Sequence, residues 1–389
     1  MNECNVSVSN HEEMGYVAGD QNFAVTHNGM TQSASNKNVT MQMAPAKEGE
    51  PVVFAITSNA GSVDFPSSKL EIANRADEFN FYDITFSAIG CSHSYSDWNV
   101  VKSATYTEAG SKSKTCSLCG DTVTEEIPVL ANPVTGYNIV LRDNIGVNFQ
   151  MNLADTDEVI ATVNGTVVSL EKNGNIISVS VAAAQMMDEI AICVNGMPLA
   201  NTYTVRGYAD YILNGDYSDA TKELVKYMLV YGGAAQTYFG YNSDSAENLA
   251  SNGITVVAKV PTGDGKVEMS GKVTGASFYG ATLVHETKTT VRFYFTGNLD
   301  GLTVTANGGE AVIGAKNNMT YVEVSGINPQ DLGTDVVVTV SDGTNTLSIS
   351  YSPLDYLVRM YNKADSSAAH KALIQALYGY YVSAAAYTA

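Results

Sequence analysis

TYTVRGYADYILNGDYSDATKELVKYMLVYGGAAQTYFGY, residues 202–241, predicts two helices joined by a short polar turn. The pattern returns in residues 348–389 as SISYSPLDYLVRMYNKADSSAAHKALIQALYGYYVSAAAYTA, in which residues 355–357 match residues 210–212. Apolar residues recur at helical spacing in both stretches. Each hairpin is therefore expected to bury an apolar stripe, with the strands that precede it as its nearest partner.

The strands before each hairpin repeat as well. Residues 147–149 match 291–293, residues 162–165 match 305–308, residues 178–181 match 321–324, and the alternating series from Asp188 matches the series from Asp335. Alternation of apolar and polar residues is typical of half-buried β-strands. We therefore predict a module that occurs twice in tandem, a small β-sandwich followed by a helical hairpin.

The predicted fold class is mainly β with α+β modules. Short strand-like runs separated by Gly, Asn, Ser and Pro fill the first part of the chain, which favours a sandwich over βαβ units. The predicted domains are a β-sandwich-like domain (1–90), a small cysteine-stapled β unit (91–131), the first sandwich with its hairpin (132–243), a linker (244–264) and the second sandwich with its hairpin (265–389).

Composition limits the partners. The formal net charge is −19 and only 21 residues are Lys or Arg, so the field of the protein repels nucleic acid and anionic lipid. No run of about twenty apolar residues occurs, so no membrane insertion is expected. The start, MNECNVSVSN, lacks the regions of a signal peptide. A secreted protein would then be represented here by part of a longer chain, expected to be monomeric; a complete cytoplasmic protein is the alternative.

Catalysis has little support in the sequence. The histidines form no nucleophile–base arrangement, and motifs for hydrolases, zinc proteases and phosphate loops are missing. Asp210 and Asp355 recur at matching positions, where a carboxylate at a helix start favours the helix dipole and needs no catalytic role. We therefore expect that the protein is not an enzyme and has no catalytic or cofactor-binding residues.

One group of residues has the spacing of a metal site. A first pair of candidate ligands, Cys91 and His93, is followed by a second pair, Cys116 and Cys119. Gly120 suits a tight turn directly after the second pair. Two such pairs complete a closed tetrahedral site, which predicts a structural zinc. A unit of about forty residues needs such a staple because its own core is small. A Cys116–Cys119 disulfide and free thiols beside an exposed His93 are the alternatives.

Tyrosines crowd both predicted hairpins. Tyrosine combines apolar area with a polar tip, which suits both packing and recognition surfaces. Most are expected to pack within the protein, and those left exposed are candidates for a protein-binding face. Exposed aromatic residues clustered on a sandwich would instead favour a sugar ligand. The tyrosines concerned are Tyr208, Tyr211, Tyr227, Tyr231 and Tyr238 in the first hairpin, and Tyr356, Tyr361, Tyr378, Tyr380, Tyr381 and Tyr387 in the second.

The small unit, CSHSYSDWNVVKSATYTEAGSKSKTCSLCGDTVTEEIPVL, resembles a cysteine-bearing repeat of cell-surface proteins from anaerobic Gram-positive gut and rumen bacteria. Tyr106 stands where that repeat usually has cysteine, so the thiol set of the family is altered here. The matching residues are His93, Trp98, Thr107, Gly110, Cys116, Cys119, Gly120, Ile127 and Pro128.

The first hairpin resembles a helical tail common in the same secreted, multi-module proteins, and the two resemblances together cover roughly residues 91–389. They imply an extracellular or cell-wall location and a non-enzymatic adhesion or spacer segment, with a host protein or a glycan as partner. A carbohydrate-binding accessory region of an extracellular glycan-degrading system is the alternative function, and a host-protein (immunoglobulin) binder is another.

Overall fold

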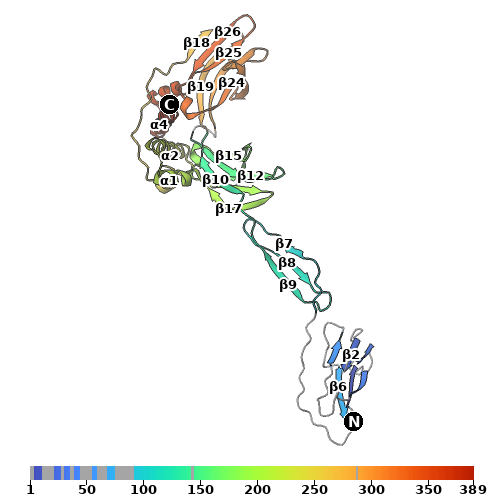
Figure 1. Cartoon of the computed structure of the whole chain (residues 1–389). Helices are drawn as coiled ribbons and strands as arrows, with labels where there is room; N and C mark the ends of the chain where they lie inside the picture. Colours follow the sequence, from blue (N-terminus) through green and yellow to red (C-terminus); the bar gives the residue numbers. More distant parts are fainter. Residues whose placement is uncertain are drawn as a thin grey trace. The chain divides into compact units, whose positions relative to one another are not determined.

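A computed structural model describes residues 92–141, 144–285 and 288–389, together with the backbone of six strands in the first 91 residues (Figure 1). The chain divides into two compact units, Met1–Leu130 and Ala131–Ala389. Residues 92–389 contain five antiparallel sheets and four α-helices, so the prediction of a mainly β protein is confirmed. None of the described helices is long and apolar enough to cross a membrane.

The six N-terminal strands form two antiparallel three-stranded sheets, ordered β4-β1-β6 and β3-β2-β5. Their side chains lie outside the described residues, and so does Cys91. The strands are β1 (Cys4–Asn10), β2 (Asn22–His27), β3 (Met30–Ser35), β4 (Val39–Met43), β5 (Ala55–Ser58) and β6 (Ser68–Asn74).

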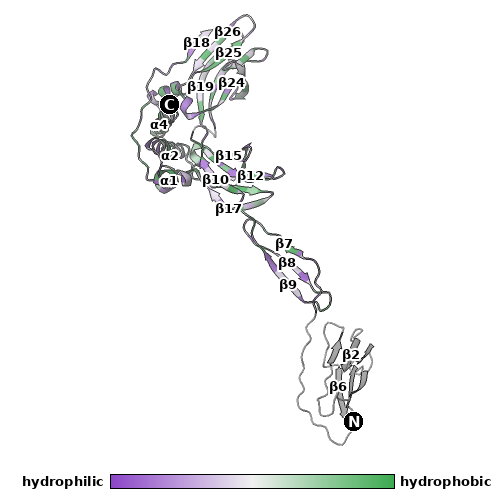
Figure 2. Cartoon of the chain, in the orientation of Figure 1, coloured by the Kyte–Doolittle hydropathy of each residue, from purple (hydrophilic) through white to green (hydrophobic). Residues whose placement is uncertain are grey.

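The small cysteine-containing part of this unit is a meander of three antiparallel strands, β7 (Asn99–Lys102), β8 (Gly110–Thr115) and β9 (Thr122–Ile127). Its residues are mostly hydrophilic in β8 and β9 (Figure 2). In residues 92–130 only Gly110 and Cys116 are buried. A side chain at Gly110 would come 2.5 Å from the Lys102 carbonyl oxygen, so the close approach of β7 requires glycine there. Burial of apolar surface therefore contributes little to the stability of this sheet.

In the second unit the same order of elements occurs twice. In the first half (residues 131–243) the sheets are ordered β10-β11-β15-β14 and β13-β12-β16-β17. The strands are β10 (Val134–Ile139), β11 (Gly146–Met151), β12 (Val159–Val163), β13 (Thr166–Val168), β14 (Leu170–Asn173), β15 (Ile176–Ser180), β16 (Ile190–Val194) and β17 (Met197–Tyr203).

The second half (residues 265–389) has sheets ordered β19-β20-β24-β23 and β18-β26-β25-β21-β22, so β18 is an additional edge strand. The hairpins β12–β13 and β21–β22 turn on Asn-Gly pairs with positive φ, which the primed turns of tight hairpins require. The strands are β18 (Glu268–Gly271), β19 (Ala276–His285), β20 (Thr289–Gly297), β21 (Thr303–Ala306), β22 (Gly309–Glu310), β23 (Val312–Lys316), β24 (Met319–Ile327), β25 (Val336–Ser341) and β26 (Thr346–Tyr351).

Alternating side chains build the core of each half. Phe149 of β11 and Phe293 of β20 are fully buried, and each is expected to contribute about 1.5–3 kcal/mol through burial. The Phe149 ring lies 4.9 Å from the Tyr203 ring in an edge-to-face contact, so side chains of the two sheets of the first half meet. In β16 and β25 the buried residues start at Ile190 and Val336 and continue at every second position.

Two helical hairpins follow these sheets, α1 (Val205–Asn214) with α2 (Asp219–Phe239) and α3 (Pro353–Asn362) with α4 (Ala368–Thr388). Each helix begins with a hydroxyl side chain that accepts a backbone N–H bond: Thr204, Ser218, Ser352 and Ser367. Helix α2 ends at Gly240, whose φ of 66° is the left-handed conformation typical of helix ends.

The long helices α2 and α4 pack against each other, and not mainly against the preceding strands as their apolar stripes predicted. A side chain at Gly379 of α4 would come 2.6 Å from the Tyr227 ring of α2, so the helices approach closely there. Tyr231 stacks on Tyr380 with ring centroids 6.0 Å apart. Short 3₁₀ turns support the other sides: α2 contacts Ala183–Gln185, and α4 contacts Pro329–Asp331.

Candidate functional site

The Cys-x-x-Cys segment forms the turn between β8 and β9. The Cys116 N–H donates to the Asp121 carbonyl (2.8 Å), and the Gly120 N–H donates to the Cys116 carbonyl (2.9 Å). Gly120 has a φ of 74°, which glycine adopts without strain. Tyr95 forms a bridge with Cys116 beside this turn. This short pairing brings His93 next to the two thiols.

Three of the four predicted ligands meet in this turn. The ligand atoms of His93, Cys116 and Cys119 all lie within 4.8 Å of one another, a cluster that can hold a metal ion. The Cys119 Sγ is 3.4 Å from the His93 Nδ1. Cys116 is buried, whereas the His93 side chain is 40% exposed. Cys91, the fourth predicted ligand, lies outside the described residues.

The surroundings favour the thiolate form that metals bind. Desolvation opposes ionisation of Cys116, but hydrogen bonds from the backbone of Leu118 and Cys119 and from the side chains of His93 and Cys119 outweigh it and lower the Cys116 pKa to about 6. The Tyr95 hydroxyl donates to the Asp121 carboxylate (2.6 Å), a bond that raises the Tyr95 pKa to about 12. The Tyr95 ring also stacks on His93 at 5.1 Å, which orients the imidazole.

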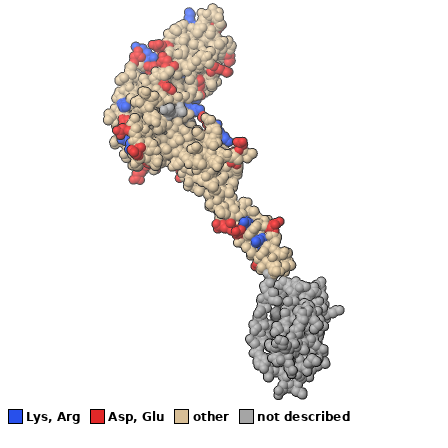
Figure 3. Space-filling model, in the orientation of Figure 1, with Lys and Arg blue, Asp and Glu red and all other residues tan. Residues whose placement is uncertain are grey.

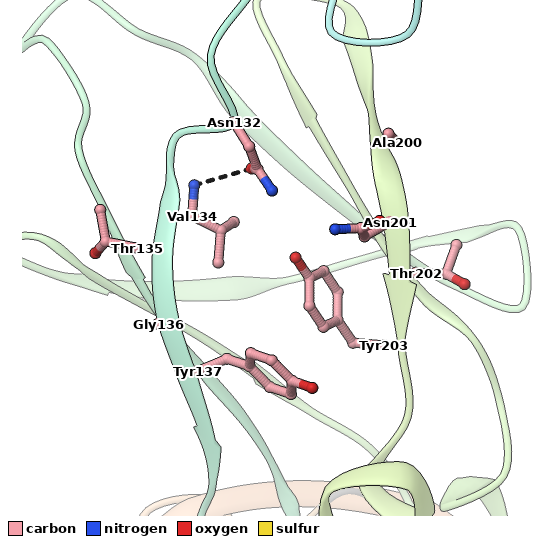
Figure 4. Close-up of a pocket in the computed structure, with 9 residues that line it drawn as sticks. All are labelled: Asn132, Val134, Thr135, Gly136, Tyr137, Ala200, Asn201, Thr202 and Tyr203. Carbon is pink, nitrogen blue, oxygen red and sulfur yellow. Dashed lines mark hydrogen bonds between the residues drawn. The ribbon is translucent and has the colours of Figure 1, made fainter.

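A second candidate site is a groove in the first half of the second unit, with a volume of about 600 Å³. It lies between the edge strands β10 and β17 (Figure 4). In that view the amides of Asn132 and Asn201 and the hydroxyl of Tyr203 face the space between the strands, and the Tyr137 ring lies along one side. The complete lining is Asn132, Val134, Thr135, Gly136, Tyr137, Ala200, Asn201, Thr202 and Tyr203.

Neighbouring aromatic rings hold the ring of Tyr137 in place. It meets Tyr203 edge-on at 4.7 Å and Tyr208 edge-on at 5.2 Å. Tyr137 is 41% exposed, whereas Tyr203 is only 8% exposed. The exposed part of Tyr137 therefore lies beside the polar groups of the groove, and its contacts with Tyr203, Tyr208 and Phe149 (6.4 Å, stacked) keep the ring in one orientation.

The tyrosines of the two hairpins range from buried to exposed, and most are half-buried. Tyr227, Tyr231 and Tyr380 are buried. Tyr211 and Tyr238 are 62% and 38% exposed. Tyr211 continues the aromatic series of the groove, since its ring lies 5.6 Å from the Tyr208 ring.

Of the histidines whose side chains the structure describes, His285 and His370 lie far from the metal cluster in sequence and have aromatic neighbours. His285 Nδ1 is 3.2 Å from the Tyr231 hydroxyl, and its ring environment lowers its pKa to about 4 through desolvation and the nearby His370. His370 stacks on Tyr238 at 5.0 Å. Neither arrangement places a nucleophile beside a base.

Sequence reasoning found the metal cluster but missed the groove. Its main residues, Asn132, Tyr137, Asn201 and Tyr203, are distant in sequence and carry no motif. Tyr137 sits in a predicted strand, where single tyrosines are usual, whereas Tyr203 belongs to the stretch predicted as helical and instead ends β17. Only the fold brings them together, since β10 and β17 are edge strands of two different sheets. Comparison of the chain with protein families, with curated proteins and with solved structures gives no match.

Proposed function

We propose that this protein is a non-enzymatic adhesion segment of a secreted or wall-associated bacterial surface protein. The cysteine-containing segment 91–131 would be a joint held together by zinc. The second unit would present two tandem modules, each a β-sandwich with a helical hairpin. The observation that carries the proposal is the cluster of His93, Cys116 and Cys119 in a sheet with almost no buried side chains. Such a unit needs a covalent or metal staple to stay folded.

Zinc is the metal that this donor set fits best. Two thiolates and an imidazole prefer zinc over magnesium or calcium, which take oxygen ligands. We propose Cys91 as the fourth ligand on the basis of its spacing, which would close the coordination shell and make the site structural. A closed shell leaves no position for a substrate, in agreement with a non-catalytic role.

The prediction is that the chain, purified without chelator, contains about one equivalent of zinc per molecule, and that Cys119→Ser removes most of it. Elemental analysis measures both. Cys193→Ser is the matched control, because Cys193 lies in β16 and far from the cluster in sequence, and it should leave the zinc content unchanged. Less than a tenth of an equivalent in the unaltered chain, with Cys116 and Cys119 oxidised, would overturn the zinc proposal in favour of a disulfide.

The charge of the surface argues against an anionic partner. Lys and Arg side chains are interspersed with Asp and Glu on the face shown in Figure 3, and the net charge is −19. Polyanions such as nucleic acid are therefore poor ligands. A host protein or a glycan fits the proposal, and adhesion is tested by screening the full chain against immobilised host proteins and a glycan array in parallel. Binding to neither would leave a spacer role only.

A further inference from the structure

The two halves of the second unit differ at one sheet edge. In the second half β18 pairs with β26, and Glu268 lies opposite Ser350. In the first half β17 occupies the place of β26, since Tyr203 and Tyr351 both directly precede the helix cap. Among the described strands, β17 pairs only with β16. The groove therefore opens at the edge that the second half covers with its own chain.

Two features of β17 disfavour the pairing of another strand with its free edge. Its pairing with β16 is interrupted between Ala191 and Cys193, whereas the pairing of β25 with β26 is regular. Pro198 also lies in β17 and has no N–H to donate. Bulges and prolines are the means by which sheet edges avoid pairing. Asn201, two residues before Tyr203 on the same strand, points into the groove (Figure 4).

The groove offers uncharged groups for hydrogen bonding. Its lining contains no Lys, Arg, Asp, Glu or His. Asn132 Oδ1 accepts the Val134 N–H (3.0 Å), which fixes this amide with its Nδ2 facing the groove. Within the described part of the chain, the Asn201 amide has no hydrogen-bond partner, although it can both donate and accept. Paired donors and acceptors of this kind complement hydroxyl groups better than phosphates or carboxylates.

The aromatic side of the groove completes a recognition pattern. Tyr137 presents a partly exposed ring (41%) that Tyr203 and Tyr208 contact edge-on. A volume of about 600 Å³ lies within the range of small-molecule sites, roughly 300–1,000 Å³. A ring face next to amides and a hydroxyl suits a ligand with a flat C–H face and a rim of hydroxyls. A pyranose has both.

The second half lacks these features at the corresponding place. Tyr137 lies opposite Phe149, and in the second half Ala281 lies opposite Phe293, so Ala281 replaces the tyrosine. The Arg359 guanidinium donates to the Ala281 carbonyl (2.7 Å), which brings a cation to this place. The aromatic and amide lining thus belongs to the first half alone, and a general need of the fold does not explain it.

We propose that the groove between β10 and β17 binds a neutral saccharide, stacked on Tyr137 and hydrogen-bonded by Asn132, Asn201 and Tyr203. This inference rests on the proposed adhesion function and names the class of its ligand. Because no charged residue lines the groove, the carboxylate of an acidic sugar would find no cationic partner there.

The test uses the labelled full chain on a glycan array that carries neutral and sialylated oligosaccharides. Neutral glycans are expected to bind the unaltered chain. For the array hit, Tyr137→Ala and Asn201→Ala should each weaken binding about tenfold or more in a titration, because each removes a stacking or hydrogen-bonding group. Asn201→Ala disturbs no ring contact, so it keeps the test valid if Tyr137→Ala unfolds the module. Tyr279→Ala is the matched control, since this 68% exposed tyrosine lies on β19 away from the groove.

The outcomes separate this inference from the function on which it rests. Binding of neutral glycans that falls with both groove variants and persists in Tyr279→Ala supports the inference. Binding restricted to sialylated glycans, binding to extended peptides, or neutral-glycan binding that survives both groove variants overturns it. A chain that binds host proteins and no glycan also overturns it and leaves the adhesion proposal standing. If the chain binds neither glycans nor host proteins, both the saccharide inference and the adhesion proposal are overturned.

Discussion

At the scale of single residues, His285 is a titratable group whose ring is desolvated within the protein. Its Nε2 is buried and has no hydrogen-bond partner among the described residues, and its Nδ1 lies 3.2 Å from the Tyr231 hydroxyl. Desolvation, together with His370, lowers its pKa from 6.5 to about 4. A proton on this ring would have to be accommodated between β19 and α2, where no carboxylate among the described residues forms an ion pair with it.

The first prediction concerns pH. Because the folded pKa of His285 is depressed, the unfolded chain binds more protons between about pH 6.5 and 4. The contribution of His285 to stability is complete above pH 6.5 and falls as the pH drops through this window, by about 2–3 kcal/mol in total. Urea unfolding at several pH values, followed by tyrosine fluorescence, measures it.

The comparison with His285→Phe isolates this contribution from the titration of carboxylates. The variant should lose part of its stability at pH 7, because the Tyr231 hydroxyl loses its partner, but its stability should change less from pH 6.5 to 4. Equal pH dependence in the two proteins would contradict the depressed pKa.

At the scale of elements, the helix caps explain why four helices start where they do. Ser352 has the fullest set of cap bonds: its Oγ accepts the Asp355 N–H (3.1 Å), and Asp355 Oδ2 accepts both the Ser352 N–H (3.2 Å) and its hydroxyl (2.6 Å). Pro353 follows at the first helical position, where it costs no hydrogen bond. This reciprocal arrangement sets the direction in which the chain leaves β26.

We expect Ser352→Ala to lower the free energy of unfolding by about 1 kcal/mol, within the usual range of about 0.5–2 kcal/mol for the loss of a cap. Chemical denaturation measures the change. Ser348→Ala is the control, since Ser348 is a half-buried serine of β26 that caps no helix. A loss equal to that of the control would show that the cap bonds of Ser352 contribute nothing beyond the loss of a serine hydroxyl.

Which elements exist could be predicted from the sequence, but their alignment could not. Periodicity located both hairpins and the strands before them. The matched pair Asp210 and Asp355 was assigned to equivalent positions, yet Asp355 lies in the first turn of α3, whereas Asp210 lies a turn further along α1 and pairs with Arg206 at 2.9 Å. The dipole explanation is therefore wrong for Asp210. A sequence match between two helices can be shifted by about one turn and still align apolar positions, because residues i and i+3 share a face.

A shift of the sequence match has larger consequences in a strand than in a helix. The sequence match of Ile190 with Val337 is wrong by one residue, since Val336 is the buried counterpart of Ile190. A slip of one residue exchanges the two faces of a strand, and valines on both faces of β25 hide it from sequence. The groove was beyond prediction for another reason: it forms between edge strands of two different sheets that lie far apart in the sequence.

At the scale of the second unit, the contact between α2 and α4 joins its two halves. Gly379 allows the Tyr227 ring to lie against the α4 backbone, and Tyr227 donates through its hydroxyl to the Val257 carbonyl (2.7 Å). The ion pair between Lys288 and Glu171 (3.3 Å) adds an exposed contact of small energetic weight. The stability of each half therefore depends on the packing of the other.

Gly379→Val should destabilise this unit by about 1–3 kcal/mol, because the new side chain overlaps the Tyr227 ring. Thermal unfolding followed by circular dichroism measures the loss. Ala386→Val places the same residue at an exposed position of α4 and should be close to neutral. Similar behaviour of the two variants would mean that the helices can separate without cost.

Tyr231 and Tyr380 lie at the same position counted from the serine that caps their helices, and they stack on each other. A contact between equivalent residues is the mark of a two-fold dimer interface. Here both partners belong to one chain, so each meets the other at an effective concentration on the order of millimolar, whatever the concentration of the protein. Dilution that would dissociate a pair of separate subunits leaves this contact intact, so a protein released into a large extracellular volume would keep it.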